Sequence, residues 1–308
     1  MAEWIDLLDP SEEELRRHLP AAVDHAVVAD LLRPATIEPT ARPTLRGYGD
    51  YVFGRLLAIV LVRDEDRVYY QEIDLVLSHD RVVTVRKTPP GEAPYDVEPV
   101  RHVCSMKRRD EPGMIAYHLL DDVAERYLDL LDGVDDEIDE LEDNIERWPN
   151  ERTRRRLSEL RHDLLHIRRT LTPTRDSVRG IIDGRVDLEG RPVFRREVFP
   201  RHVEREFGVV YDKLLRAVES LELSRDLLAA ARDYHQTKIS TDQNEVMKKL
   251  TVIASLLLLP TFIVGLYGQN FKHHFPELGW QWGYAWSWGL IVATTLLQLW
   301  FFRRKRWI

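Results

Sequence analysis

Two uncharged apolar segments, close together near the end of the chain, constrain the fold more than any other feature. Residues 250–266 and residues 284–302 contain no charged side chain. A helix rises about 1.5 Å per residue and the hydrocarbon core of a bilayer is about 30 Å thick, so each segment can cross a membrane. Pro260 interrupts the first segment, and hydroxyl groups such as that of Thr261 are expected to satisfy the carbonyls it frees. We predict two membrane-spanning helices joined by a short outer loop.

Basic residues predict the orientation of these helices. Lys248 and Lys249 precede the first segment, and the basic cluster 303–306 follows the second. The joining loop, 268–282, carries one lysine and one glutamate, Glu277. Because cytoplasmic flanks are enriched in Lys and Arg, both termini are expected in the cytoplasm and the loop outside. Tryptophans near both ends of the second segment fit an interfacial aromatic belt. The predicted location is the plasma (inner) membrane, with the lipid bilayer as a partner.

The rest of the chain has the composition of a water-soluble protein. The 308 residues carry a formal net charge of −8, which argues against nucleic acid as a partner. One cysteine, Cys104, rules out an internal disulfide framework and reads as a small apolar filler. The first residues are acidic and lack the apolar region of a signal peptide, so none is expected.

We predict an α+β fold in four regions. Ser11 and Glu14 fit a capping box that opens a short helix, and residues 51–62, 68–78 and 82–87 are predicted strands of an α/β domain over 1–115. Apolar residues then recur every three or four positions on both sides of a turn at residues 148–150, which predicts a helical hairpin within 116–199. A stalk helix is expected over 200–249. It leads into a membrane domain over 250–308, with helices 250–267 and 284–302 and an outer loop 268–283.

The predicted hairpin is polarised in charge. Residues 121–146 contain 13 Asp or Glu, and residues 147–169 contain eight Arg. One interpretation is two solvated faces that attract each other, each exposed pair contributing a few tenths of a kcal/mol. The other is an acidic surface that concentrates or senses divalent cations. Spacing alone favours the first.

One stripe of the long helix changes character along its length. At heptad-like spacing it carries a set that we call the long-helix stripe: Asp233, Thr237, Ser240, Asn244, Met247, Leu250 or Thr251, Ala254, Leu258, Thr261 and Gly265. The cytosolic half is polar and the membrane half is small or flexible and apolar. It is either an ordinary oligomer seam, in which polar residues fix the register, or a pore lining that closes by dewetting. Because two crossings cannot enclose an aqueous path, a pore requires several copies of the chain.

Oxygen groups along this path suit a hydrated cation. Asp233 and Asn244 offer oxygens in the cytosolic half. At the outer end, Gly268 lets the backbone leave the helix and Asn270 can direct an amide oxygen at the axis. Mg²⁺ gives up its waters reluctantly, so a ring of such oxygens can hold it through its hydration shell. Asp233, Asn244 and Asn270 are therefore the candidate metal-contacting residues.

The outer loop resembles that of the CorA family of magnesium transporters. That family carries Tyr-Gly-Met-Asn-Phe between its two crossings, followed by Pro-Glu-Leu, Trp and Gly-Tyr. In this chain the corresponding residues are Tyr267, Gly268, Asn270, Phe271, Pro276, Glu277, Leu278, Trp280, Gly283 and Tyr284. Residues 244–248 are similar to the family's pore mouth. Weaker similarities upstream, at residues 4–7 and 48–51, extend the resemblance over the whole chain.

The resemblance implies a funnel-shaped homopentamer in which the first crossing of each chain lines the pore. Tyr267, Gly268, Gln269 and Asn270 would form the outer selectivity site, with Glu277 in the loop. The implied activity is passive, potential-driven uptake of Mg²⁺, and possible cargo extends to Co²⁺ and Ni²⁺. No resident cofactor is expected, and metal bound between cytosolic subunit faces would close the pore. Residues that would line the conduit are Asp233, Asn244, Met247, Leu250, Ala254, Leu258 and Thr261.

Two departures from the family pattern keep alternatives open. Gln269 stands where the family has Met, and a second amide at the mouth could change ion choice. Val209 precedes Tyr211 and Asp212 where some members carry an aspartate, which weakens the expectation of metal-gated closure. The alternatives are a zinc transporter, proton-coupled or not, and a membrane-tethered sensor or scaffold that conducts nothing.

The other candidate motifs are better interpreted as ordinary surface or loop residues than as chemical sites. His162 and His166 have zinc-ligand spacing on a helix but no third ligand in sequence, so surface histidines are the better interpretation. His273 and His274 are interpreted as residues of a solvated loop. The sequence shows no phosphate-binding loop, HExxH motif or nucleophile elbow, so no enzymatic activity is expected.

Overall fold

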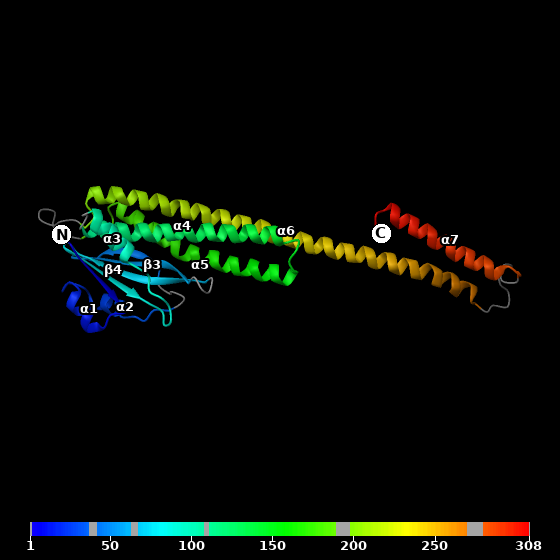
Figure 1. Ribbon diagram of the computed structural model, residues 1–308, viewed down its shortest axis with the longest axis horizontal. Coiled ribbons are helices and arrows are strands. Elements are labelled where there is room, and N and C mark those ends of the chain that lie inside the picture. The colour runs from blue at the N-terminus through cyan, green and yellow to red at the C-terminus, as the bar shows by residue number, and fades with distance from the viewer. Residues whose placement is uncertain are drawn as a thin grey trace. The chain divides into compact units, whose positions relative to one another are not determined.

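The computed structural model describes residues 2–36, 42–62, 67–107, 111–188, 198–269 and 280–307. The chain forms two compact units, Met1–Ala231 and Arg232–Ile308. Figure 1 shows the elements in chain order by colour. The first unit holds a five-stranded sheet with helices on both faces. The second holds the end of the long helix and the final helix.

The sheet has the strand order β1-β5-β4-β3-β2. Its strands are β1 (Glu3–Leu8), β2 (Thr44–Gly47), β3 (Val52–Val62), β4 (Arg67–Leu77) and β5 (Arg81–Lys87). β1 pairs with β5 in parallel, and the other neighbours are antiparallel. The three predicted strands are confirmed. The two edge strands were not predicted, because β2 has four residues and β1 is short and carries Asp6.

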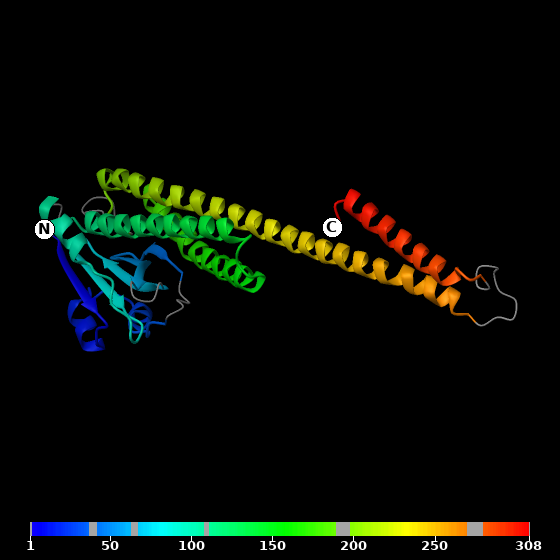
Figure 2. The same ribbon diagram turned by 45° about the vertical axis from the view of Figure 1, so that its right-hand side comes forward.

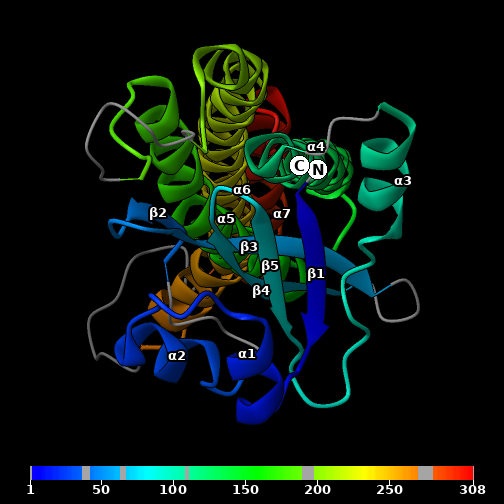
Figure 3. The same ribbon diagram turned by 90° about the vertical axis from the view of Figure 1, so that its left-hand side faces the viewer.

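Two short helices cover one face of this sheet, on the opposite side from the long helices (Figure 3). They are α1 (Glu12–His18) and α2 (His25–Leu31), and Leu15, Val28 and Leu31 bury against Phe53 and neighbouring strand residues. The predicted capping box is confirmed, because the Glu14 amide donates to Ser11 Oγ and the Ser11 amide donates to the Glu14 carboxylate.

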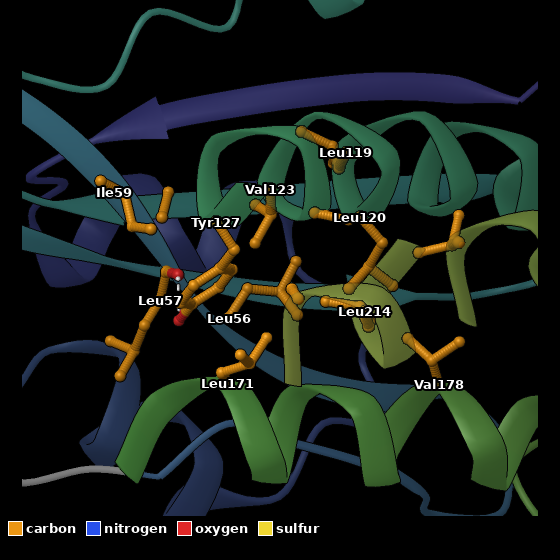
Figure 4. Close-up of a cluster of buried hydrophobic side chains, with 14 of the residues drawn as sticks. Leu56, Leu57, Ile59, Leu119, Leu120, Val123, Tyr127, Leu171, Val178 and Leu214 are labelled. Carbon is orange, nitrogen blue, oxygen red and sulfur yellow. Dashed lines mark hydrogen bonds between the residues drawn. The ribbon is translucent and has the colours of Figure 1, made fainter. Parts of the chain in front are cut away.

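Long helices cover the other face of the sheet. α3 (Glu98–Lys107) lies beside α4 (Pro112–Asn144), and α4 forms a hairpin with α5 (Asn150–Ile182). The first part of α6 (Arg201–Tyr267) completes this layer. Figure 4 shows the apolar contacts that join the layer to β3, where the Tyr127 hydroxyl donates to the Leu57 carbonyl at 3.4 Å. The predicted turn at Trp148 and Pro149 is confirmed.

The acidic residues of α4 and the arginines of α5 were expected to attract each other across the hairpin. Among the described ion pairs, they pair with each other less than this expectation supposed. Arg156 on α5 contacts Glu137 on α4, but Arg154 and Arg155 pair with glutamates of their own helix. A further bridge to the acidic face comes from α6. Lys213 Nζ lies 2.6 Å from both Asp121 and Glu125 of α4. The acidic face of α4 therefore helps to fasten α6 to the bundle.

Candidate functional site

Two helices are long and apolar enough to span a membrane, namely α6, whose final part belongs to the second unit, and α7 (Gly283–Arg304). α7 runs back beside the final part of α6 (Figure 2). The least exposed α6 residues here are Val252 and Ile263, at 4% and 6%, with Leu256 and Leu259 half-buried between them. Their spacing of four, three and four residues defines one face of the helix, which we call the buried face of α6.

The long-helix stripe lies roughly opposite this buried face, at 100° of helical rotation per residue. Its predicted pore-lining members are exposed along their whole length: Asp233, Asn244, Met247, Leu250, Ala254, Leu258 and Thr261. Met247 and Leu258 are 59% and 69% exposed. A Cβ placed on Gly265 would meet no atom within 4 Å. In one chain these residues therefore lie on an uncovered side of α6, and residues 240–251 are exposed all round the helix.

Hydroxyl groups on this part of α6 donate back to their own helix. Thr251 Oγ1 donates to the Met247 carbonyl at 2.8 Å, and Thr261 Oγ1 to the Leu257 carbonyl at 2.6 Å. The expectation for Thr261 needs a correction, because Pro260 frees the carbonyl of Leu256 rather than that of Leu257. Since each hydroxyl proton is used within the helix, its oxygen lone pairs remain able to accept from water or face a cation.

The predicted outer site begins where α6 ends. Tyr267 is the last helical residue and is half-buried, and the Gly268 amide donates to the Val264 carbonyl at 2.9 Å. Gly268 and Gln269 are exposed. A Cβ on Gly268 would lie 3.1 Å from the Val264 carbonyl oxygen, so the backbone is tight at this position. Asn270 and Glu277, the other predicted residues here, lie outside the described residues.

On the N-terminal side of the apolar stretch of α6, the predicted oxygen ligands are exposed and dispersed. Asp233 Oδ1 lies 3.6 Å from Arg232, and Asn244 is exposed three turns further along α6. Within the described part of the chain, no group of three or more His, Cys, Asp or Glu side chains is arranged to hold a metal ion. The ring centroids of His162 and His166 lie 4.4 Å apart, and no third metal-binding side chain joins them among the described residues. Cys104 is buried in the main core, as expected of a filler.

Sequence reasoning missed one polar residue between the two membrane helices. Gln298 on α7 donates from Nε2 to the backbone carbonyl of Ser255 on α6 at 3.1 Å. The signal that could have found it is a lone amide in an otherwise apolar crossing, since such groups in membrane helices generally face another helix.

Comparison with known proteins places the chain in a family. A family model described as CorA-like Mg²⁺ transporter protein matches residues 2–304. The chain belongs to this family. A CorA relative from Thermotoga maritima, a cobalt/magnesium transport protein, is 27% identical over 267 residues, covering 87% of this chain and 73% of the relative.

Solved structures show that the fold is that of CorA proteins. The complete CorA magnesium transporter structure from Methanocaldococcus jannaschii aligns with a TM-score of 0.74 at 19% identity, covering 99% of this chain and 91% of that one. The structure of the full-length CmaX protein aligns with a TM-score of 0.68 at 21% identity, covering 99% and 88%. The predicted resemblance and the predicted α+β fold with two C-terminal apolar helices are therefore confirmed.

Proposed function

We propose that this CorA family member is a divalent-cation transporter that takes up Mg²⁺ through a central pore, with Co²⁺ and Ni²⁺ as further cargo. The observation that carries the proposal is the uncovered long-helix stripe, opposite the buried face of α6. A helix face with oxygens at one end and small or flexible apolar residues at the other suits a pathway that is wet when open and dewets when closed. Transport of cobalt and magnesium is named for the Thermotoga relative.

The assembly that we propose is a funnel-shaped homopentamer with α6 innermost. One chain exposes the stripe but encloses no path, so several copies must face one another across an axis. In this assembly residues 1–115 and the hairpin 116–199 form the cytosolic mouth, 200–249 the stalk and 250–308 the pore domain. The membrane is the plasma (inner) membrane and both termini are cytoplasmic, following the basic residues that flank the crossings.

The selectivity site that we propose is the outer ring of Tyr267, Gly268, Gln269 and Asn270. Amide oxygens from several subunits would contact a hydrated Mg²⁺ through its waters, which avoids the cost of stripping them. Gly268 and Gln269, which directly follow α6, are exposed, and this is compatible with such a ring. The amide of Gln269 keeps the polarity of this site high.

We propose that the cytosolic part of the assembly controls the opening of the pore. Since the described residues of one chain offer no three-ligand metal group, a regulatory ion would be held by carboxylates from adjacent subunits. Lowering cytosolic Mg²⁺ is then expected to raise the open fraction. The transported ion is the cargo, and no resident cofactor is required.

Uptake into liposomes tests the proposal. Purified protein is reconstituted around a magnesium-sensitive dye, and Mg²⁺ is added outside at a negative-inside potential. Wild-type protein should admit Mg²⁺, and Asn270→Ala should lower the initial rate by about tenfold, as expected when a ring of filter ligands is lost. His273→Ala, in the same loop, is the matched control and should keep the wild-type rate.

Each other outcome would contradict a particular part of the proposal. Wild-type-like Mg²⁺ uptake by Asn270→Ala would exclude the assignment of the selectivity site. Zinc entry that depends on a proton gradient, without magnesium entry, would indicate the zinc transporter. Entry of no divalent ion at any potential would leave the sensor or scaffold. The family match favours neither of these two alternatives.

A further inference from the structure

Gln298 occupies an unusual place for an amide. It lies on α7 among apolar residues, six positions before the end of the helix. Its Nε2 donates to the Ser255 carbonyl at 3.1 Å, and its Oε1 is buried with no hydrogen-bond partner among the described residues. The orientation of the amide follows from chemistry, because a flipped group would place two acceptor oxygens against each other. An unpaired amide oxygen in the apolar interior of a membrane costs free energy. A role for the hydrogen bond that Nε2 makes would explain why an amide stands at this position.

The acceptor end of this bond is a backbone atom at a sensitive position. Ser255 precedes Pro260 by five residues, and Pro260 cannot donate to the carbonyl of Leu256 next to Ser255. This stretch of α6 therefore lacks one of its backbone hydrogen bonds. The hydrogen bond from Gln298 on α7 restrains the α6 backbone from outside, one residue away from the carbonyl that Pro260 leaves free.

Ser255 also sits at the border of the two faces of α6. The buried face passes through Val252 and Leu256, and the long-helix stripe passes through Ala254 and Leu258. Holding the Ser255 carbonyl therefore resists rotation of α6 about its own axis. Leu257 is exposed beside the stripe, at 66% against 69% for Leu258. Such a rotation would turn Ala254 and Leu258 away from the proposed pathway and bring Leu257 toward it.

We propose that Gln298 is a positioning residue that fixes the rotation of α6 and so keeps Ala254 and Leu258 directed at the ion pathway. This deepens the function proposed above and rests on it. The side chain does not contact the ion in this role. It acts through the backbone of the neighbouring helix, so loss of the amide should disturb the conducting arrangement and leave the outer selectivity ring intact.

Thiol accessibility tests the orientation directly. In a Cys104→Ala background, single cysteines replace Ala254, Leu258 or Leu257, and reaction with a water-soluble thiol reagent is timed in reconstituted full-length protein. Positions 254 and 258 should react faster than position 257. Gln298→Met, similar in length but without the amide, should reduce that ratio about 3- to 15-fold, the range expected for one interhelical hydrogen bond in a membrane.

Matched variants separate positioning from general damage. Ser255→Ala keeps the carbonyl that accepts the bond and should preserve the ratio and the Mg²⁺ uptake rate, as should Leu296→Met on the exposed side of α7. Gln298→Asn, too short to reach, should behave like Gln298→Met and serves if the methionine variant fails to assemble. In both Gln298 variants the ratio of Mg²⁺ uptake to Co²⁺ uptake should stay unchanged while both rates fall.

Failure of this inference differs from failure of the proposed function. A wild-type thiol ratio in assembled Gln298→Met and Gln298→Asn overturns the positioning role, whatever the flux. Equal reactivity of positions 254, 257 and 258 in otherwise wild-type protein overturns the pore face itself. Absence of Mg²⁺ uptake with a normal thiol pattern overturns the transported ion and leaves the role of Gln298 standing.

Discussion

At the scale of single residues, two glycines in the membrane helices have different expected roles. Gly265 lies on the long-helix stripe, and Gly289 lies on the side of α7 away from its half-buried residues. A Cβ at either position would meet no atom within 4 Å. The two sites are thus equally roomy within one chain, and they differ in whether they face the proposed pathway.

Gly265→Val should lower Mg²⁺ uptake by about tenfold or more, because each subunit then adds a branched apolar side chain to one ring of the conduit. Gly289→Val should leave the rate within about twofold. The measurement is initial uptake in liposomes at matched protein content. Equal rates for the two variants would place Gly265 outside the conduit.

The capping box of α1 predicts a local pH dependence. Hydrogen bonds from the Ser11 backbone and side chain lower the pKa of Glu14 below its ordinary 4.5. A carboxyl with a lowered folded pKa contributes stability that is complete above pH 4.5 and is lost as the pH falls through the folded value. Amide-exchange protection of α1 should therefore decline in acid beyond the trend of α2. Glu14→Gln should remove this excess decline, and its persistence would rule out Glu14 as the cause.

At the scale of elements, the attachment of α6 to the bundle rests partly on Lys213. Its ammonium contacts Asp121 and Glu125 of α4 at 2.6 Å each, and its side chain is 15% exposed. Most other ion pairs around the hairpin have more exposed partners, such as Arg154 and Glu151 at 73% and 81%. The half-buried bridge should therefore contribute more than the exposed one.

Lys213→Met should lower the free energy of unfolding of the first unit, Met1–Ala231, by roughly 1–2 kcal/mol, since it leaves two carboxylates without their shared donor. Arg154→Met is the control and should change it by less than about 0.5 kcal/mol. Denaturant unfolding of the full-length protein in detergent, followed by amide exchange in α4 and α6, measures both. Equal effects would mean that apolar packing alone holds α6 in place.

How much of the fold the sequence predicts depends on local pattern. Strands β3 to β5 and the hairpin turn were predictable, because β-branched runs and a Trp-Pro break are local signals. The start of α4 was not, since Gly113 to Leu120 are buried on all sides and show no amphipathic period. For the candidate site, periodicity found the exposed stripe. The Gln298–Ser255 bond joins residues 43 apart and follows from tertiary packing.

At the scale of the whole molecule, the proposed uptake requires no chemical energy source. A divalent ion gains about 4.6 kcal/mol per 100 mV of inside-negative potential, twice the value for one charge. Setting the potential with a potassium gradient and valinomycin should therefore control the direction and rate of Mg²⁺ uptake in the absence of ATP. Uptake that ignores the potential would indicate an electroneutral exchange, such as coupling to protons.

In the proposed assembly, several copies of the chain arrange the exposed stripe of α6 around one aqueous axis. A density map of the full-length protein in lipid tests it most directly. We expect a ring of five α6 helices with α7 outside and with Asn244, Met247 and Leu258 facing a central passage. A map in which α7 is innermost, or in which the α6 helices are separated by lipid, would contradict it.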